Sequence, residues 1–110
     1  MPNYQKSLMI FVGETDMWQD ARLYAAIVTT LERQGIAGVT VNLGLMGYGH
    51  HRRIHRKGLF GVSDDKPVTI IAVDTEEKIR AVLPIITPMV REGLIMLQDT
   101  EVISIGLAAL

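Results

Sequence analysis

The residues of this sequence that are best suited to chemistry lie between positions 44 and 57. Residues 50–57 read His-His-Arg-Arg-Ile-His-Arg-Lys, and they hold all three histidines and four of the eleven lysines and arginines. Gly44, Gly47 and Gly49 come shortly before them. Glycine lets backbone N–H groups approach an anion, and an arginine guanidinium can hold phosphate through two parallel hydrogen bonds. The segment therefore predicts an anion site. Its spacing matches neither a P-loop nor a dinucleotide fingerprint, and a solvated basic loop without a ligand is an equal alternative.

The histidines also raise the question of a metal site. His51 and His55 stand four residues apart and would share one face of a helix. Four cationic side chains lie among the histidines, and their charge repels an incoming divalent cation. No carboxylate lies within residues 50–57 to complete a ligand set. We therefore expect no metal site and no required cofactor.

The acidic residues and the serines give little support for catalysis. Asp16 is expected to cap a helix, with Gln19 three residues later completing a capping box. Asp64 and Asp65 are expected to form a turn before Pro67. No serine lies in a nucleophile motif. The chain is accordingly not expected to be an enzyme.

The composition is that of a small globular protein. The 110 residues are 48% hydrophobic and 21% charged, which is enough to build one packed domain over residues 1–110. The net charge is −1, so the residues outside the basic cluster carry −5 together. The chain has no cysteine, and its longest apolar runs are far too short to insert into a bilayer, so we expect a cytoplasmic protein. Trp18 and Phe60 are too few to stack nucleic-acid bases, so no nucleic-acid partner is expected.

Apolar periodicity predicts the order of elements that must position these residues. Strands are expected at residues 7–12, 38–46, 68–73 and 94–105. One helix is expected between Asp16 and Gly35, and a second, interrupted by two prolines, between Asp74 and Gly93. Residues 47–61 read as a long loop. The order β-α-β-β-α-β predicts an α+β, ferredoxin-like fold, in which two helices cover one face of a four-stranded antiparallel sheet.

Two of the expected strands are apolar on both faces. In residues 8–12 and 68–73 both alternating sets of side chains are largely hydrophobic. A sheet with one face in water normally alternates apolar and polar residues. Since two helices can cover only one face, another copy of the chain is the simplest cover for the other. The pattern therefore predicts a homo-oligomer.

Several segments, taken in order, resemble a known family. They are Gly13-Glu14-Thr15-Asp16, Leu23-Tyr24-Ala25-Ala26-Ile27-Val28, Gly44-Leu45-Met46-Gly47-Tyr48-Gly49, Ile54-His55, Ser63-Asp64-Asp65-Lys66-Pro67 and Val73-Asp74. Together, over roughly residues 7–103, they resemble the PII-like domain-of-unknown-function family, number 190 in its series. Before Leu23 that family often carries Gly-Lys-Pro, where this sequence has Asp20-Ala21-Arg22.

The resemblance implies a ferredoxin-like homotrimer that holds an adenine nucleotide (ATP, ADP or AMP) in clefts between subunits. It also implies that loop 47–61 corresponds to the T-loop through which PII signal proteins contact their partners. Genes of the family often lie beside fluoride-channel genes, so a membrane transporter or channel is an expected partner.

We therefore predict a nucleotide site centred on the loop. Gly47 and Gly49 would admit the ligand to the backbone, and Tyr48 would pack near a base. The predicted anion contacts are His50, Arg52, Arg53 and His55.

Three further residues complete the predicted site. Glu14 and Asp16 would line the same cleft, and Arg91 would reach in from a neighbouring subunit. Two alternatives stay open: a metal-binding trimer resembling the divalent-cation-tolerance proteins, and a structural assembly without a ligand. Histidines interleaved with carboxylates would favour the metal protein, whereas histidines interleaved with arginines favour an anion.

Overall fold

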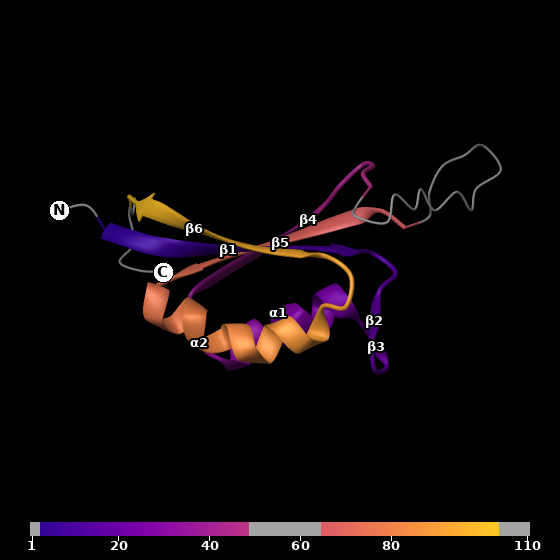
Figure 1. The fold of residues 1–110 in the computed structure, drawn as a ribbon, viewed down its shortest axis with the longest axis horizontal. Coiled ribbons are helices and arrows are strands. Elements are labelled where there is room, and N and C mark those ends of the chain that lie inside the picture. Colours follow the sequence, from indigo (N-terminus) through magenta and orange to yellow (C-terminus); the bar gives the residue numbers. More distant parts are fainter. Residues whose placement is uncertain (1–2, 49–64, 104–110) are drawn as a thin grey trace.

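The computed structural model describes residues 3–48 and 65–103, and within them the expected order of main elements is confirmed (Figure 1). The strands of the main sheet are β1 (Asn3–Gly13), β4 (Gly38–Leu43), β5 (Pro67–Asp74) and β6 (Leu94–Val102). The helices are α1 (Leu23–Arg33), α2 (Glu76–Ile86) and the short 3₁₀ helix η1 (Thr87–Met89). A small hairpin, β2 (Met17–Trp18) with β3 (Ala21–Arg22), joins β1 to α1.

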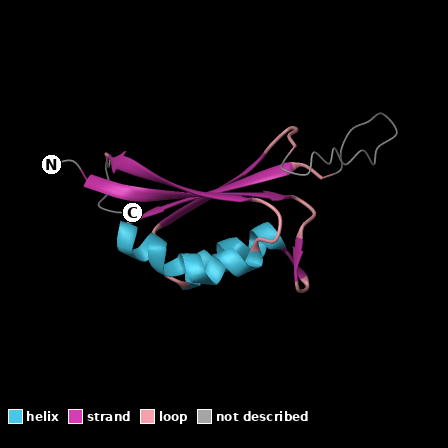
Figure 2. Cartoon of the chain, in the orientation of Figure 1, coloured by secondary structure: helices cyan, strands magenta, loops and turns pink. Residues whose placement is uncertain are grey.

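The main sheet is antiparallel throughout, with the strand order β4-β5-β1-β6. The helices α1 and α2 lie together on one face of it, and the other face is bare (Figure 2). Alternate residues of β1 and β5 point toward the helices and are buried there, including Leu8, Ile10 and Ile70. Leu23, Ile27 and Leu31 of α1 close this core, as their four-residue spacing predicts.

The start of α1 differs from the prediction. The helix begins at Leu23, its N-cap is Arg22, and no side chain caps it. Asp16 instead accepts a hydrogen bond on its carboxylate from the Gly13 N–H at 2.8 Å, and its carbonyl oxygen accepts one from the Leu23 N–H at 2.7 Å. The capping box at Asp16 and Gln19 was therefore wrong, because the Asp16 carboxylate closes a turn directly after β1.

The start of α2 is close to expectation. Thr75, one residue later than predicted, is the N-cap, and its hydroxyl accepts a hydrogen bond from the Lys78 N–H at 3.2 Å. The buried Asp74 accepts hydrogen bonds from the N–H groups of Ala37, at 2.9 Å, and Thr75, at 2.7 Å. The prolines act as predicted, since α2 ends at Ile86 and η1 follows as a separate turn.

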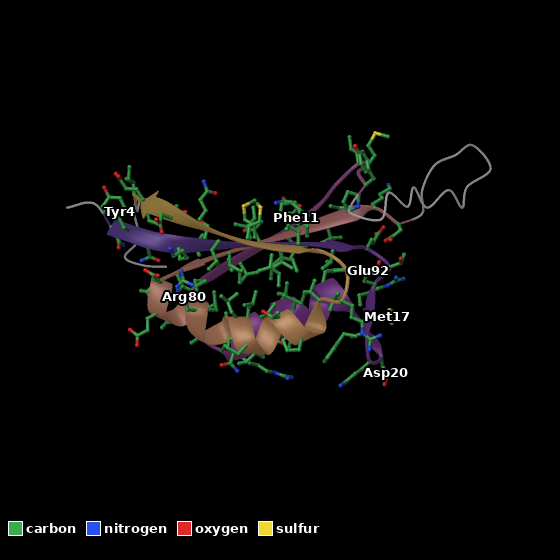
Figure 3. The ribbon with its side chains drawn as sticks, in the orientation of Figure 1. Tyr4, Phe11, Met17, Asp20, Arg80 and Glu92 are labelled. Carbon is green, nitrogen blue, oxygen red and sulfur yellow. The ribbon has the colours of Figure 1, made fainter. Side chains whose placement is uncertain are left out.

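The bare face of the sheet is apolar over one half. Cross-strand registers place Phe11 between Thr69 and Leu94, and Met9 between Ile71 and Met96. Figure 3 shows Phe11 on the side of the sheet opposite the helices. Leu94 and Met96 are exposed. The expectation of a second apolar face is thus met within the described strands.

Strand boundaries shift by a few residues. β1 begins four residues earlier than expected, at Asn3, and β4 ends at Leu43 and not at Met46. The last backbone bond that continues the β4–β5 ladder runs from the Gly44 N–H to the Pro67 oxygen, at 2.6 Å. The expected last residues of β6, 104 and 105, lie outside the described residues.

Candidate functional site

The described candidate residues come from the connections at one end of the sheet. In the registers Gly13 pairs with Pro67, Leu43 with Val68, and Phe11 with Leu94. The turn after β1, the segment after β4, the residue before β5 and the turn before β6 therefore share this end (Figure 1). Glu14, Asp16, Gly47, Tyr48 and Arg91 all belong to these connections. The predicted residues Gly49, His50, Arg52, Arg53 and His55 lie outside the described residues.

Both ends of the long loop are anchored near Pro67. A Cβ atom added to Gly44 would lie 2.6 Å from Pro67 Cγ and 3.1 Å from the Pro67 carbonyl oxygen. A Cβ atom added to Gly47 would lie 3.3 Å from the same Cγ atom. Gly44 is thus required by packing, and Gly47 sits in a tight but less crowded place. These glycines have a structural reason to be there in addition to the backbone approach predicted for Gly47.

The turn after β1 is joined to the residues that lead into β5. The Glu14 N–H donates to the Lys66 carbonyl oxygen at 2.8 Å, and the Thr15 N–H donates to Asp65 Oδ1 at 3.0 Å. A Cβ atom at Gly13 would lie 2.7 Å from Asp65 Oδ2. The Asp65 carboxylate therefore lies directly over the turn.

Asp65 was interpreted only as part of a turn, and its contact with Thr15 was missed. The two residues are 50 positions apart, and no local pattern connects them. The segment Ser63-Asp64-Asp65-Lys66-Pro67, quoted for the family resemblance, was the one signal that drew attention to this position.

The two outer parts of the predicted site are separated by the width of the sheet. Tyr48 follows β4 at one edge, and Arg91 precedes β6 at the other. Three strand spacings amount to about 14 Å. Tyr48 is 72% exposed, with Leu45 and Met46 beside it at 91% and 86%. The subunit by itself thus presents an exposed aromatic ring and a distant arginine.

Charged groups cluster at the opposite end of the sheet. The Lys6 ammonium pairs with Asp99 and lies 3.9 Å from Glu76, whose carboxylate accepts a hydrogen bond from Arg80 at 2.9 Å. The hydrogen bond from Arg80, followed by the charge of Lys6, lowers the pKa of Glu76. The hydrogen bond from Lys6 and its charge lower the pKa of Asp99. This cluster ties β1, β6 and α2 together, away from the candidate site.

Two searches of the described ranges, 3–48 and 65–103, bear on other kinds of site. No group of three or more histidine, cysteine, aspartate or glutamate side chains there could hold a metal ion. No helix in those ranges is long and apolar enough to cross a membrane.

The fold defines the class of protein. The structure of CPII from Thiomonas intermedia K12, bound to ADP, AMP and acetate, matches it with a TM-score of 0.69 and 24% identity, over 94% of this chain and 93% of that one. CPII is described as a nitrogen regulatory PII-like protein. A PII-like signaling protein of Thermus thermophilus, TTHA0516, matches with a TM-score of 0.64 and 16% identity, over 93% and 92% of the two chains. The chain has the ferredoxin-like fold of PII-like proteins.

The sequence then places the chain in a family. It belongs to DUF190, described as "Uncharacterized ACR, COG1993", whose model matches residues 5–102. UPF0166 protein MJ1524 of Methanocaldococcus jannaschii is 38% identical over 98 residues, which are 88% of this chain and 90% of the relative. A UPF0166 protein of Aquifex aeolicus is 33% identical over 99 residues, covering 90% and 93%. The resemblance noted from the sequence is confirmed.

Proposed function

We propose that this chain is a cytoplasmic, non-enzymatic PII-like signalling protein that binds an adenine nucleotide, or a related anion, between the subunits of a homotrimer. Loop 47–61 carries the response to a partner, a membrane transporter or channel. The observation that carries the proposal is the gathering of the described candidate residues at one end of a fold that, in CPII, has been seen with ADP and AMP.

The ligand class follows from the chemistry at this end of the sheet. Tyr48 offers an exposed ring for stacking on a base. The loop that follows it carries Arg52 and Arg53, whose guanidinium groups suit phosphate. Glu14 lies in the turn held against Lys66, close to the base of the loop. Asp16 already accepts the Gly13 N–H, so its role at the site is to hold the turn.

The requirement for more than one subunit follows from the position of Arg91. Because Tyr48 and Arg91 lie at opposite edges of the sheet, a single subunit cannot bring both to one small ligand. A neighbouring copy can bring its own Arg91 beside the loop. The half-exposed apolar face around Met9 and Phe11 gives an independent reason for assembly, since exposed patches of this kind mark interfaces.

Isothermal titration calorimetry with ATP, ADP and AMP tests the proposal. Wild-type protein is expected to bind at least one of them, and the double variant R52A/R53A is expected to bind about 10- to 150-fold more weakly for each charge-assisted hydrogen bond lost. The matched control is R33A/K78A, which removes the same charge at the opposite end of the sheet. Absence of binding by the wild type, or equal losses in both double variants, would contradict the proposed site.

A further inference from the structure

The main sheet has two free edges, and they differ in character. β4 forms one outer edge and β6 the other. Residues 38–48, which contain β4, include no charged residue and no proline. Natural edge strands are usually protected by charges, by proline or by a covering element. The edge of β4 has neither charge nor proline within this range.

The directions of the backbone groups follow from the ladder. The Gly44 N–H points to Pro67, so by alternation the N–H and C=O groups of Val39, Val41 and Leu43 point away from β5 into the free edge. Following the same alternation through β5 and β1 places the outward groups of β6 at Ile95, Leu97 and Asp99.

The side chains at both edges belong to the face that carries the helices. Val41 pairs with the buried Ile70, and Leu43 with the buried Val68, yet Val41 is 39% exposed and Leu43 55%. Ile95 and Leu97 pair with the buried residues Ile10 and Leu8, and they pack against the core only in part. Each edge therefore has two apolar side chains on the helix side that are incompletely covered.

We infer that the β4 edge of one copy pairs antiparallel with the β6 edge of the next. In the matching register Val41 lies opposite Leu97 of the partner subunit, and Leu43 lies opposite Ile95 of the partner subunit. The inference deepens the proposed function and rests on its assembly part. Apolar side chains meet on the helix side, and the outward N–H and C=O groups of both strands are satisfied.

Two observations favour this occupant over a symmetric pairing of two β4 edges. A β4–β4 pair leaves both β6 edges and both bare faces uncovered, whereas head-to-tail pairing uses both edges of every copy and can close into a ring. In the chosen register the partner's Asp99 falls opposite Val39 and still keeps its ion pair with Lys6 of its own subunit. Continuing the register past the strand ends brings Gly47 level with the partner's Arg91, the residue that the proposed site needs.

The chain has no cysteine, so engineered disulfides can read the register directly. Thr40 and Gln98 are exposed and would be neighbours across the inferred pairing. Within one subunit they are separated by at least three strand spacings, about 14 Å, which no disulfide spans. T40C/Q98C is expected to form intermolecular disulfides under mild oxidation at least about tenfold faster than T40C/T100C, whose cysteines lie one pleat out of register.

Other results would overturn the inference. Cross-linking of T40C/Q98C no faster than T40C/T100C refutes the register, and rapid cross-linking of T40C/N42C shows the symmetric β4–β4 pair. If the wild type scatters light as an oligomer and T40C/Q98C does not cross-link, only the edge pairing fails. A 12.2 kDa wild-type monomer refutes the proposed assembly as well.

A charge on the edge gives a second measurement. V41K is expected to reduce the assembly to 12.2 kDa monomers in light scattering, while its circular dichroism stays that of the wild type. The control is I85K on α2, because Ile85 is 41% exposed and thus matches Val41 at 39%. Retention of the oligomer by V41K, or equal dissociation of I85K, contradicts the pairing.

Discussion

Replacing Gly44 with alanine tests whether the base of the long loop is packed as tightly as its geometry indicates. The added Cβ would lie 2.6 Å from Pro67 Cγ, where ordinary contacts begin at 3.4 Å, so the two groups must separate by about 0.8 Å. The 2.6 Å hydrogen bond from the Gly44 N–H to the Pro67 oxygen opposes that movement. Overpacking of this kind costs about 1–3 kcal/mol.

Urea unfolding followed by circular dichroism, at one fixed protein concentration, measures this cost. G47A is the graded comparison, since its Cβ would lie 3.3 Å from the same ring atom, and it is expected to lose less stability than G44A. A double-mutant cycle gives the decisive result. P67A removes Cγ, so G44A should cost about 1 kcal/mol less in the P67A background than in the wild type. Equal costs in both backgrounds would show that the contact with Pro67 is not the cause.

Three further outcomes are expected. Because the folded-state pKa values of Glu76 and Asp99 are lowered, their stabilising contribution is complete above the ordinary carboxylate range and is lost as pH falls below about 4.5; K6M should flatten this acid dependence in urea midpoints measured from pH 7 to pH 3, and an unchanged profile would contradict the ion cluster. I27A, which truncates a fully buried side chain of α1, should lower the free energy of unfolding by about 2–5 kcal/mol, whereas V28A at a half-buried position should cost less; equal costs would contradict the burial. G93A places a Cβ atom 2.4 Å from the Phe11 carbonyl oxygen, so it should be more destabilising than G44A by urea unfolding, because here the clash is with backbone; a smaller effect than that of G44A would contradict the close approach of β1 and the turn before β6.

The elements set by short-range patterns were predictable from the sequence. The four-residue spacing of Leu23, Ile27 and Leu31 predicted α1, and the apolar alternation of β5 predicted both a core strand and a second apolar face. The prolines correctly predicted the interruption after α2. In each case the deciding interaction lies within one turn or one strand.

What sequence reasoning missed depends on geometry between distant residues or on a turn without its usual signal. The β2–β3 hairpin turns at Gln19, which has φ 54, a conformation that normally favours glycine, and so no glycine marked the turn. The use of Asp65 to hold Thr15 involves residues 50 positions apart. The predicted site gathers at one end of the sheet, but no spacing in the sequence showed that Arg91 and Tyr48 would lie at opposite edges. The strand order decides that separation.

The central position of β1 has a consequence for the synthesis of the protein. Its two partners in the sheet are β5 and β6, so Asn3–Gly13 leaves the ribosome first and pairs last. At typical translation rates of about 5–20 residues per second, roughly 5–18 s pass before β6 is complete. During that time the nascent chain carries an unpaired strand that is apolar on both sides. We expect this first strand to be the segment that general chaperones recognise on the ribosome, and the folding rate to be limited by its long-range pairing.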